Sequence, residues 1–197
     1  SVRKLLIADK NKRIKGIIPV DFAGRVVNLE AFRNLADEYN CWLIEDACHA
    51  PGGSFVNSKG QQELAGNGKY ANLSIFSFHP VKHIAAGEGG MITTNDEKLY
   101  NILLNLRSHG IQQDPSKKHE NHGLWYYEMQ TLGFNYRLTD FQAALGLSHL
   151  NRADDGLKRR IEIANRYTKA FSDLSYIRQF SGDIEGHAYH LYILQVE

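Results

Sequence analysis

The order strand, helix, strand near the start of the chain is the feature that most constrains its fold. Residues 14–20 contain a short apolar run, and residues 28–39 carry apolar side chains at helical spacing behind Asn28, a capping residue type. A second apolar run covers residues 41–44. A strand, a crossover helix and a strand in this order form a right-handed parallel unit. The sequence therefore predicts an α/β fold with a mostly parallel sheet and flanking helices.

Further apolar segments extend this pattern along the chain. Residues 73–78 and 89–95 read as strands, and the tight turn between them predicts an antiparallel pair. Helices are expected from Asp96 to about His109, after a capping Thr139 or Asp140, and over residues 157–171 beyond a break near 154–156. The first carries Leu99, Ile102, Leu103 and Leu106 on one face. The second should bury the side formed by Phe141, Ala144, Leu145 and Leu147 or Ser148. Residues 51–68 and 111–123 are expected to be loops, the second a candidate lid.

Composition indicates the class of protein. The 197 residues carry a net charge of +1, 43% of them are apolar, and no run approaches the length of a bilayer span. We therefore expect a soluble, cytoplasmic protein that binds neither nucleic acid nor membrane. Cys41 and Cys48 fit reduced packing residues of a cytosolic protein better than a disulfide framework.

Both ends of the sequence indicate a fragment. The chain opens without Met on residues 1–7, whose apolar spacing fits the tail of a helix, and it closes on residues 190–197, which read as a strand in progress. We therefore expect the central part of a longer protein.

Side chains that could take part in catalysis cluster where the predicted strands end. Asp46 and His49 follow the second strand, while Ser77 and Lys82 follow the third, just before a glycine-rich turn. Ligands of open α/β sheets bind outside the carboxyl ends of the strands. A pyridoxal phosphate site needs a lysine for a Schiff base, a carboxylate at the pyridine nitrogen and donors for the phosphate. Taken singly, Lys82 is more simply interpreted as a solvated lysine and Asp46 as a helix cap or turn former.

A metal site is not expected. His119 and His122 lie close together in a polar segment, but no strong third ligand is near them in the sequence. A solvated loop is the simpler interpretation.

Three runs together resemble one family. Residues 45–50 (EDACHA), residues 76–82 (FSFHPVK) with 87–90 (GEGG), and residues 133–140 (GFNYRLTD) with 142–145 (QAAL) are similar, in this order, to the DegT/DnrJ/EryC1/StrS nucleotide-sugar aminotransferases. Residues 125–130 and 189–192 most resemble the branch that aminates C4 of a UDP-4-keto-6-deoxy-N-acetylhexosamine on the way to pseudaminic acid. The resemblance implies a fold-type I pyridoxal phosphate enzyme.

The resemblance also assigns roles and domains. It implies that Lys82 forms the internal aldimine and shuttles protons, that Asp46 pairs with the pyridine nitrogen, and that Ser77 binds the phosphate. His49 stands where many members have Gln near the phenolic oxygen, and Asn135 matches an asparagine that reaches the neighbouring subunit's cofactor, which implies a homodimer with shared sites. His79 and Arg137 are candidates for the nucleotide diphosphate. Residues 1–150 would be a partial large domain, and residues 151–197 a linking helix and the start of the small domain.

The implied reaction moves an amino group from an amino acid, glutamate, to a 4-keto sugar nucleotide. Two alternatives remain open from the sequence. Related sugar dehydratases carry histidine in place of the lysine, against which Lys82 argues although His83 is adjacent. An inactive truncated protein is the second alternative, because the phosphate-binding turn and the aromatic that stacks on the cofactor in the family lie in a part of the family's sequence that this chain does not match.

Overall fold

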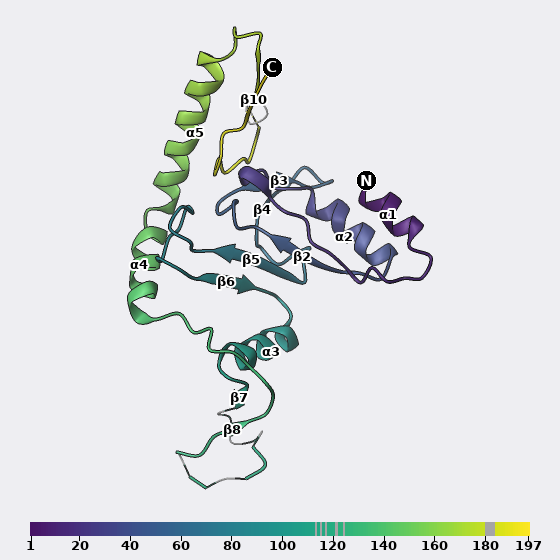
Figure 1. The fold of residues 1–197 in the computed structure, drawn as a ribbon, viewed down its shortest axis with the longest axis vertical. Helices are drawn as coiled ribbons and strands as arrows, with labels where there is room; N and C mark the ends of the chain where they lie inside the picture. The colour runs from purple at the N-terminus through teal and green to yellow at the C-terminus, as the bar shows by residue number, and fades with distance from the viewer. Residues whose placement is uncertain (113, 115, 117, 121, 124, 180–183) are drawn as a thin grey trace.

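A four-stranded sheet forms the centre of the molecule. The computed structural model describes residues 1–112, 114, 116, 118–120, 122–123, 125–179 and 184–197. The strand order is β1-β2-β5-β6, in which the first three strands are parallel and β6 is antiparallel to β5 (Figure 1). The strands are β1 (Gly16–Ile17), β2 (Trp42–Asp46), β5 (Leu73–Ser77) and β6 (Gly90–Thr93). The predictions of a mostly parallel sheet and an antiparallel last pair are confirmed.

The first strand is shorter than the apolar run that predicted it. Only Gly16 and Ile17 pair continuously with β2, and the pairing returns as a single bridge between Val20 and Asp46. Pro19 lies between these points, and a proline has no N–H to give to a ladder. Its carbonyl still accepts a hydrogen bond from Asp46 N at 2.9 Å, which keeps this edge of the sheet in register.

Helix α2 (Leu29–Glu38) packs its apolar face against the sheet, as predicted. Asn28 caps it by accepting a hydrogen bond from Ala31 N at 2.9 Å. Leu35 and Ala36 are buried in a cluster that also contains Leu6 of α1 (Val2–Ala8), Ile17, Cys41, Leu43 and Ala71. Cys41 and Cys48 are both free thiols.

The largest stability effect is expected at Leu43, which is fully buried at the centre of this cluster. Leu43→Ala removes packed methyl groups and leaves a cavity, so we expect a loss of about 2–5 kcal/mol in the free energy of unfolding. Leu64→Ala is the matched control, because Leu64 is 56% exposed. Chemical denaturation of both variants checks the prediction, and equal losses at the two positions would contradict it.

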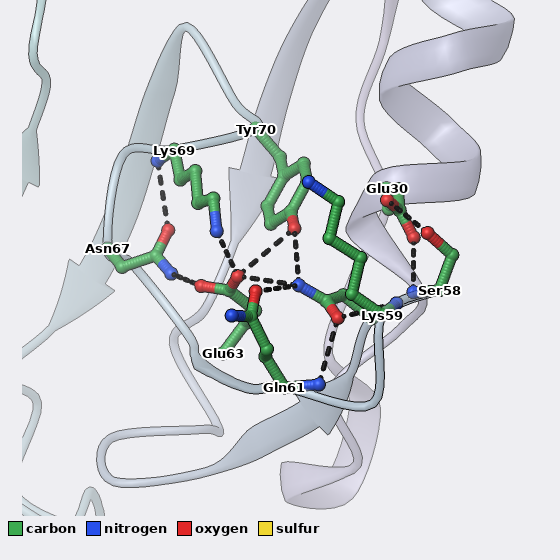
Figure 2. A network of polar contacts seen from close by, with 9 residues as sticks. Glu30, Ser58, Lys59, Gln61, Glu63, Asn67, Lys69 and Tyr70 are labelled. Atoms are coloured by element: carbon green, nitrogen blue, oxygen red, sulfur yellow. Dashed lines mark hydrogen bonds and ion pairs between the residues drawn. The ribbon is translucent and has the colours of Figure 1, made fainter.

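The segment expected to be a loop over residues 51–68 contains a hairpin, so that prediction is wrong in part. Strands β3 (Ser54–Val56) and β4 (Gln62–Leu64) pair antiparallel. Figure 2 shows the polar network that holds this hairpin, in which the buried Glu63 accepts hydrogen bonds from Lys69, Asn67 and Tyr70. These strands were not predicted, because each is only three residues long and lies among turn-forming residues.

The remaining helices follow the predicted order with one correction. Helix α3 (Glu97–Arg107) is capped by Asp96, and α4 (Asp140–Leu150) by Thr139 in a capping box with Gln142. The predicted break near residues 154–156 is wrong. The chain turns at Asn151 and Arg152 instead, and α5 (Ala153–Ala170) runs through Gly156 without interruption.

Short strand pairs lie outside the central sheet. Strand β7 (Ile111–Gln112) pairs with β8 (Glu128–Met129), so the start of the expected loop 111–123 is not a free loop, and part of the loop lies outside the described residues. Strand β9 (Ile177–Gln179) pairs with β10 (Leu194–Val196), which confirms the strand expected at the end of the sequence. Within the described ranges, no helix is long and apolar enough to cross a membrane.

The buried side predicted for α4 is wrong for this chain, and the apolar face of α3 is likewise not fully buried. Neither helix contains a buried residue, and Phe141 is 91% exposed. In Figure 1 α4 lies at the border of the molecule, beside β5 and β6, and α3 lies below the sheet with β7 and β8. The apolar residues follow helical spacing, but within the described part of the chain little packs against them.

Candidate active site

Asp46, Cys48, His49 and Lys82 lie together at the carboxyl edge of the parallel strands. Asp46 is the last residue of β2 and is in register with Ile75 of β5. Lys82 follows the end of β5 by five residues, and its charge acts on both the Cys48 thiol and the His49 imidazole. The structure thus brings together the lysine, the carboxylate and the imidazole singled out in the sequence.

The Asp46 carboxyl group lies against both the backbone and the thiol of Cys48. Its Oδ1 accepts a hydrogen bond from Cys48 N at 3.1 Å, and the Cys48 thiol also lies within hydrogen-bonding reach of the carboxyl group. Burial raises the pKa of Cys48 to about 12, and the neighbouring Asp46 carboxylate adds to that shift. Cys48 is therefore a neutral thiol at pH 7 at this position.

The hydrogen bonding of His49 fixes its tautomer. His49 Nδ1 accepts a hydrogen bond from Ala23 N at 3.3 Å, so the ring proton sits on Nε2. Burial lowers the pKa of His49, and the positive charge of Lys82 lowers it further. His49 is therefore a neutral ring with one N–H to donate, which fits a ligand atom that accepts hydrogen bonds.

Lys82 lies in a turn stabilised by backbone hydrogen bonds. Lys82 N donates to His79 O at 2.9 Å, Phe78 N donates to Gly89 O at 2.8 Å, and Ala86 N donates to Phe78 O at 2.9 Å. Gly87 has a φ of +79°, a conformation that favours glycine. The Lys82 amine makes no hydrogen bond or ion pair with the described residues, so it is available for reaction.

Ser77 and His79 are both placed by the same strand end. Ser77 pairs with Gly90 across β5 and β6, and its Oγ accepts a hydrogen bond from His79 N at 3.3 Å. His79 is exposed, with Nε2 4.0 Å from a Glu88 carboxylate oxygen. The roles of Ser77 in phosphate binding and of His79 in nucleotide binding stay predictions.

Asn135 and Arg137 are not brought to the lysine in the same way. Asn135 is exposed and forms a bridge with Ser108 just past α3, and nothing in the described part of the chain bonds it to Asp46 or Lys82. Arg137 is exposed beside Leu138, whose Cδ1 lies 2.8 Å from where a Cβ on Gly89 would be. Arg137 therefore lies near the glycine turn, while Asn135 lies beside Ser108 at the end of α3.

Three residues beside the site had no role in the sequence-based interpretation. The His190 ring lies 4.3 Å from that of His49 and 5.5 Å from that of His83, between ring centroids. Burial lowers the pKa of His83 and of His190 to about 4, with a contribution from Arg160, so both rings are neutral at pH 7. Arg160 donates to Tyr189 O at 3.3 Å. Only the tertiary fold joins these positions, since His190 is far from His49 in the sequence.

The two histidines weighed as metal ligands have carboxylate partners. His119 Nδ1 lies 3.1 Å from Glu128, and His122 Nε2 lies 2.6 Å from Glu120. Within the described ranges, no group of three side chains is arranged to hold a metal ion.

Comparison with known sequences identifies the relatives of this chain. The profile of the DegT/DnrJ/EryC1/StrS aminotransferase family matches residues 5–197. The spore coat polysaccharide biosynthesis protein SpsC of Bacillus subtilis is 39% identical over 186 residues, covering 94% of this chain and 46% of SpsC. A UDP-4-amino-4,6-dideoxy-N-acetyl-β-L-altrosamine transaminase of Campylobacter jejuni is 41% identical over 184 residues, covering 93% of this chain and 45% of that enzyme. The chain thus spans about half the length of the curated relatives it matches.

Solved structures give the same result for the fold. PseC of Helicobacter pylori, an aminotransferase of pseudaminic acid biosynthesis, matches with a TM-score of 0.83 and 30% identity, covering 98% of this chain and 48% of PseC. The sugar aminotransferase Spr1654 of Streptococcus pneumoniae, in its PMP form, matches with a TM-score of 0.78 and 31% identity, covering 98% of this chain and 52% of Spr1654.

These matches confirm the predicted fold-type I architecture and a pyridoxal phosphate-dependent family. The chemistry of the site agrees, because an amine, a carboxyl group and a neutral imidazole donor lie at one sheet edge. The profile match covers nearly the whole chain, in the order of the three sequence runs that first suggested it. The chain belongs to the DegT/DnrJ/EryC1/StrS aminotransferase family.

Proposed function

We propose that the protein containing this chain transfers an amino group from glutamate to the 4-keto carbon of a 4-keto-6-deoxy sugar nucleotide. The observation that carries the proposal is the unpaired Lys82 amine close to Asp46 and His49 at the carboxyl edge of the sheet. The name of the Campylobacter jejuni relative and the pathway of PseC support a substrate of the N-acetylhexosamine class.

Each residue would have one task. Pyridoxal phosphate, when bound, supplies an electron sink for the carbon that loses its proton. Lys82 Nζ would anchor the cofactor and, once released, carry the proton between cofactor and substrate carbons. The Asp46 carboxyl group would accept the pyridine N–H and keep that nitrogen protonated. His49 Nε2–H would donate to the phenolic oxygen, and Ser77 Oγ–H to the phosphate.

We also propose a cytoplasmic homodimer in which Asn135 of one subunit reaches the cofactor of the other. The exposed apolar side chains of α4 and the segment before it support an interface, since exposed apolar surface is the kind of surface that protein partners cover. They are Leu132 at 83%, Phe134 at 52%, Tyr136 at 71%, Phe141 at 91%, Leu147 at 59% and Leu150 at 55%. The division into a partial large domain over residues 1–150 and the start of a small domain over 151–197 belongs to the same proposal, as do the nucleotide contacts of His79 and Arg137.

The dehydratase alternative is not favoured. Lys82 occupies the position where that class carries histidine, and the matched relatives named for an activity are transaminases. The inactive-fragment alternative concerns this chain alone, which spans less than half of those curated relatives.

Covalent labelling tests the proposed anchor. The product of the complete open reading frame and the 197-residue chain are each incubated with pyridoxal phosphate, reduced with borohydride and digested. We expect a phosphopyridoxyl group on the peptide that contains Lys82, because that amine lies beside Asp46 and His49. Label spread over surface lysines, or none in the complete protein, would overturn the proposal. Label in the complete protein alone would favour an inactive fragment.

A further inference from the structure

A pair of buried carboxyl groups lies beneath Asp46, on the opposite face of the sheet. Asp21 is 0% exposed and Glu45 is 1% exposed. Neighbouring residues of a strand point to opposite faces, so Glu45 faces away from the side of Asp46. Val20 bridges to Asp46, which places the next residue, Asp21, on the face of Glu45. Neither carboxyl group contacts the proposed cofactor site directly.

The hydrogen bonds of the pair leave room for one shared proton. Glu45 accepts from Ser74 Oγ at 2.5 Å and from Gly66 N at 3.0 Å, and Asp21 Oδ1 accepts from Val27 N at 2.9 Å. Asp21 Oδ2 is buried and receives no N–H or O–H from elsewhere in the described ranges. It lies against the Glu45 carboxyl group, and a hydrogen bond between two carboxyl groups forms only when one of them is protonated.

The electrostatics of this position agree with a retained proton. Burial raises the pKa of Asp21 to about 8, and the negative charges of Glu45 and Asp46 add to the shift. The other groups around the pair are the Ser74 hydroxyl and backbone N–H groups, while the nearby Arg25 acts on His187. In the described part of the chain, no cation compensates the two carboxylates.

Asp21 also connects to both Asp46 and His49, the proposed cofactor ligands at and just after the end of β2. Its backbone N donates to Asp46 O at 3.0 Å, and its carbonyl accepts from Gly24 N at 3.0 Å. The turn η1 (Phe22–Gly24) that follows supports His49, through the hydrogen bond from Ala23 N and a ring contact with Phe22 at 5.9 Å. Ala23 has a φ of +62°, so this turn needs its flanking bonds to keep its shape.

We propose that Asp21 is a positioning residue for the cofactor site, and that the proton it shares with Glu45 keeps the Phe22–Gly24 turn, and through it His49 and Asp46, in place. The inference rests on the proposed function, because the proposed function makes Asp46 and His49 the cofactor ligands that Asp21 positions. Asp21 itself touches neither cofactor nor substrate.

The first experiment uses the protein without cofactor. Because the pKa of Asp21 lies above its ordinary value, the stability from the shared proton is present at low pH and is lost as pH rises through about 8. We expect the wild-type Tm to fall between about pH 7 and pH 9. Asp21→Asn should lack this fall, since the amide donates to Glu45 at every pH. Asp154→Asn, an exposed carboxylate of α5, is the control and should keep the wild-type profile. A wild-type Tm that is flat over this range, or the same fall in Asp21→Asn, would overturn the shared proton.

The second experiment measures cofactor affinity of the complete open reading frame product by fluorescence at pH 7 and pH 9. We expect the cofactor affinity of wild type and of Asp154→Asn to be about tenfold weaker at pH 9 than at pH 7. Asp21→Asn should bind the cofactor equally well at the two pH values. Equal pH dependence in Asp21→Asn and wild type would show that the pair does not position the site. Should wild type fail to bind the cofactor at any pH, the proposed function fails, while the unfolding profiles still decide the shared proton.

Discussion

Lys82→Ala is expected to lower the transamination rate by about 10³-fold or more, because it removes the group that moves the proton between cofactor and substrate. The unpaired amine beside Asp46 and His49 is the reason for this expectation. Turnover of a 4-keto sugar nucleotide with glutamate, measured on the complete open reading frame product, checks it. The cofactor-dependent visible band of the wild type should also be absent, whereas the Tm of the unliganded protein should change little.

Chemical rescue separates loss of the amine from loss of the fold. A small primary amine such as methylamine should restore part of the rate to Lys82→Ala, since it can occupy the space of the missing side chain. Lys59→Ala, an exposed lysine of the hairpin shown in Figure 2, should behave as wild type. Full activity in Lys82→Ala would show that another group carries the proton.

Asp46→Ala is expected to lower the same rate by about 10²–10³-fold, because it removes the anion that keeps the pyridine nitrogen protonated. Asp46→Asn should lose nearly as much, since an amide keeps the shape of the side chain and not its charge. Comparing the two variants separates the charge of Asp46 from its hydrogen bond. The asparagine oxygen can still accept the Cys48 N–H that Asp46 Oδ1 accepts, so a loss of rate in both variants is due to the missing charge.

Kinetics and spectra of both variants check this prediction. A cofactor analogue with a permanent positive charge at the ring nitrogen, N-methyl pyridoxal phosphate, should recover activity in Asp46→Ala, since it no longer depends on the carboxylate. Asp37→Asn on α2 is the charge-matched control, because Asp37 is an exposed carboxylate paired with Arg33. An Asp46→Asn variant with wild-type rate would remove Asp46 from the mechanism.

Much of the scaffold could be predicted from local patterns. The face of α2 and the antiparallel turn-back of β6 follow from periodicity and turn residues, which depend on neighbours in the sequence. The capping side chains of Asn28, Asp96 and Thr139 lie where predicted for the same reason. The β3–β4 hairpin was missed because strands of three residues give too little alternation to detect against a turn-rich background.

The apolar faces of α3 and α4 show a different limit of sequence patterns. Periodicity predicts that Phe141 and Leu147 have a partner, and both are exposed in this chain. Helical periodicity shows that one face of a helix is apolar. It does not show whether the surface that covers this face belongs to the same segment of the chain.

The α/β class, the family and the residues that belong to its motifs follow from the sequence, because each motif is a contiguous run. Which of these residues meet depends on the tertiary structure. It placed Lys82 beside Asp46 and His49, left Asn135 against Ser108, and added His83, His190 and the Asp21–Glu45 pair. The physical reason is that the burial and the electrostatics of a site depend on all the residues around it. Sheet register brings these residues together from separate parts of the chain.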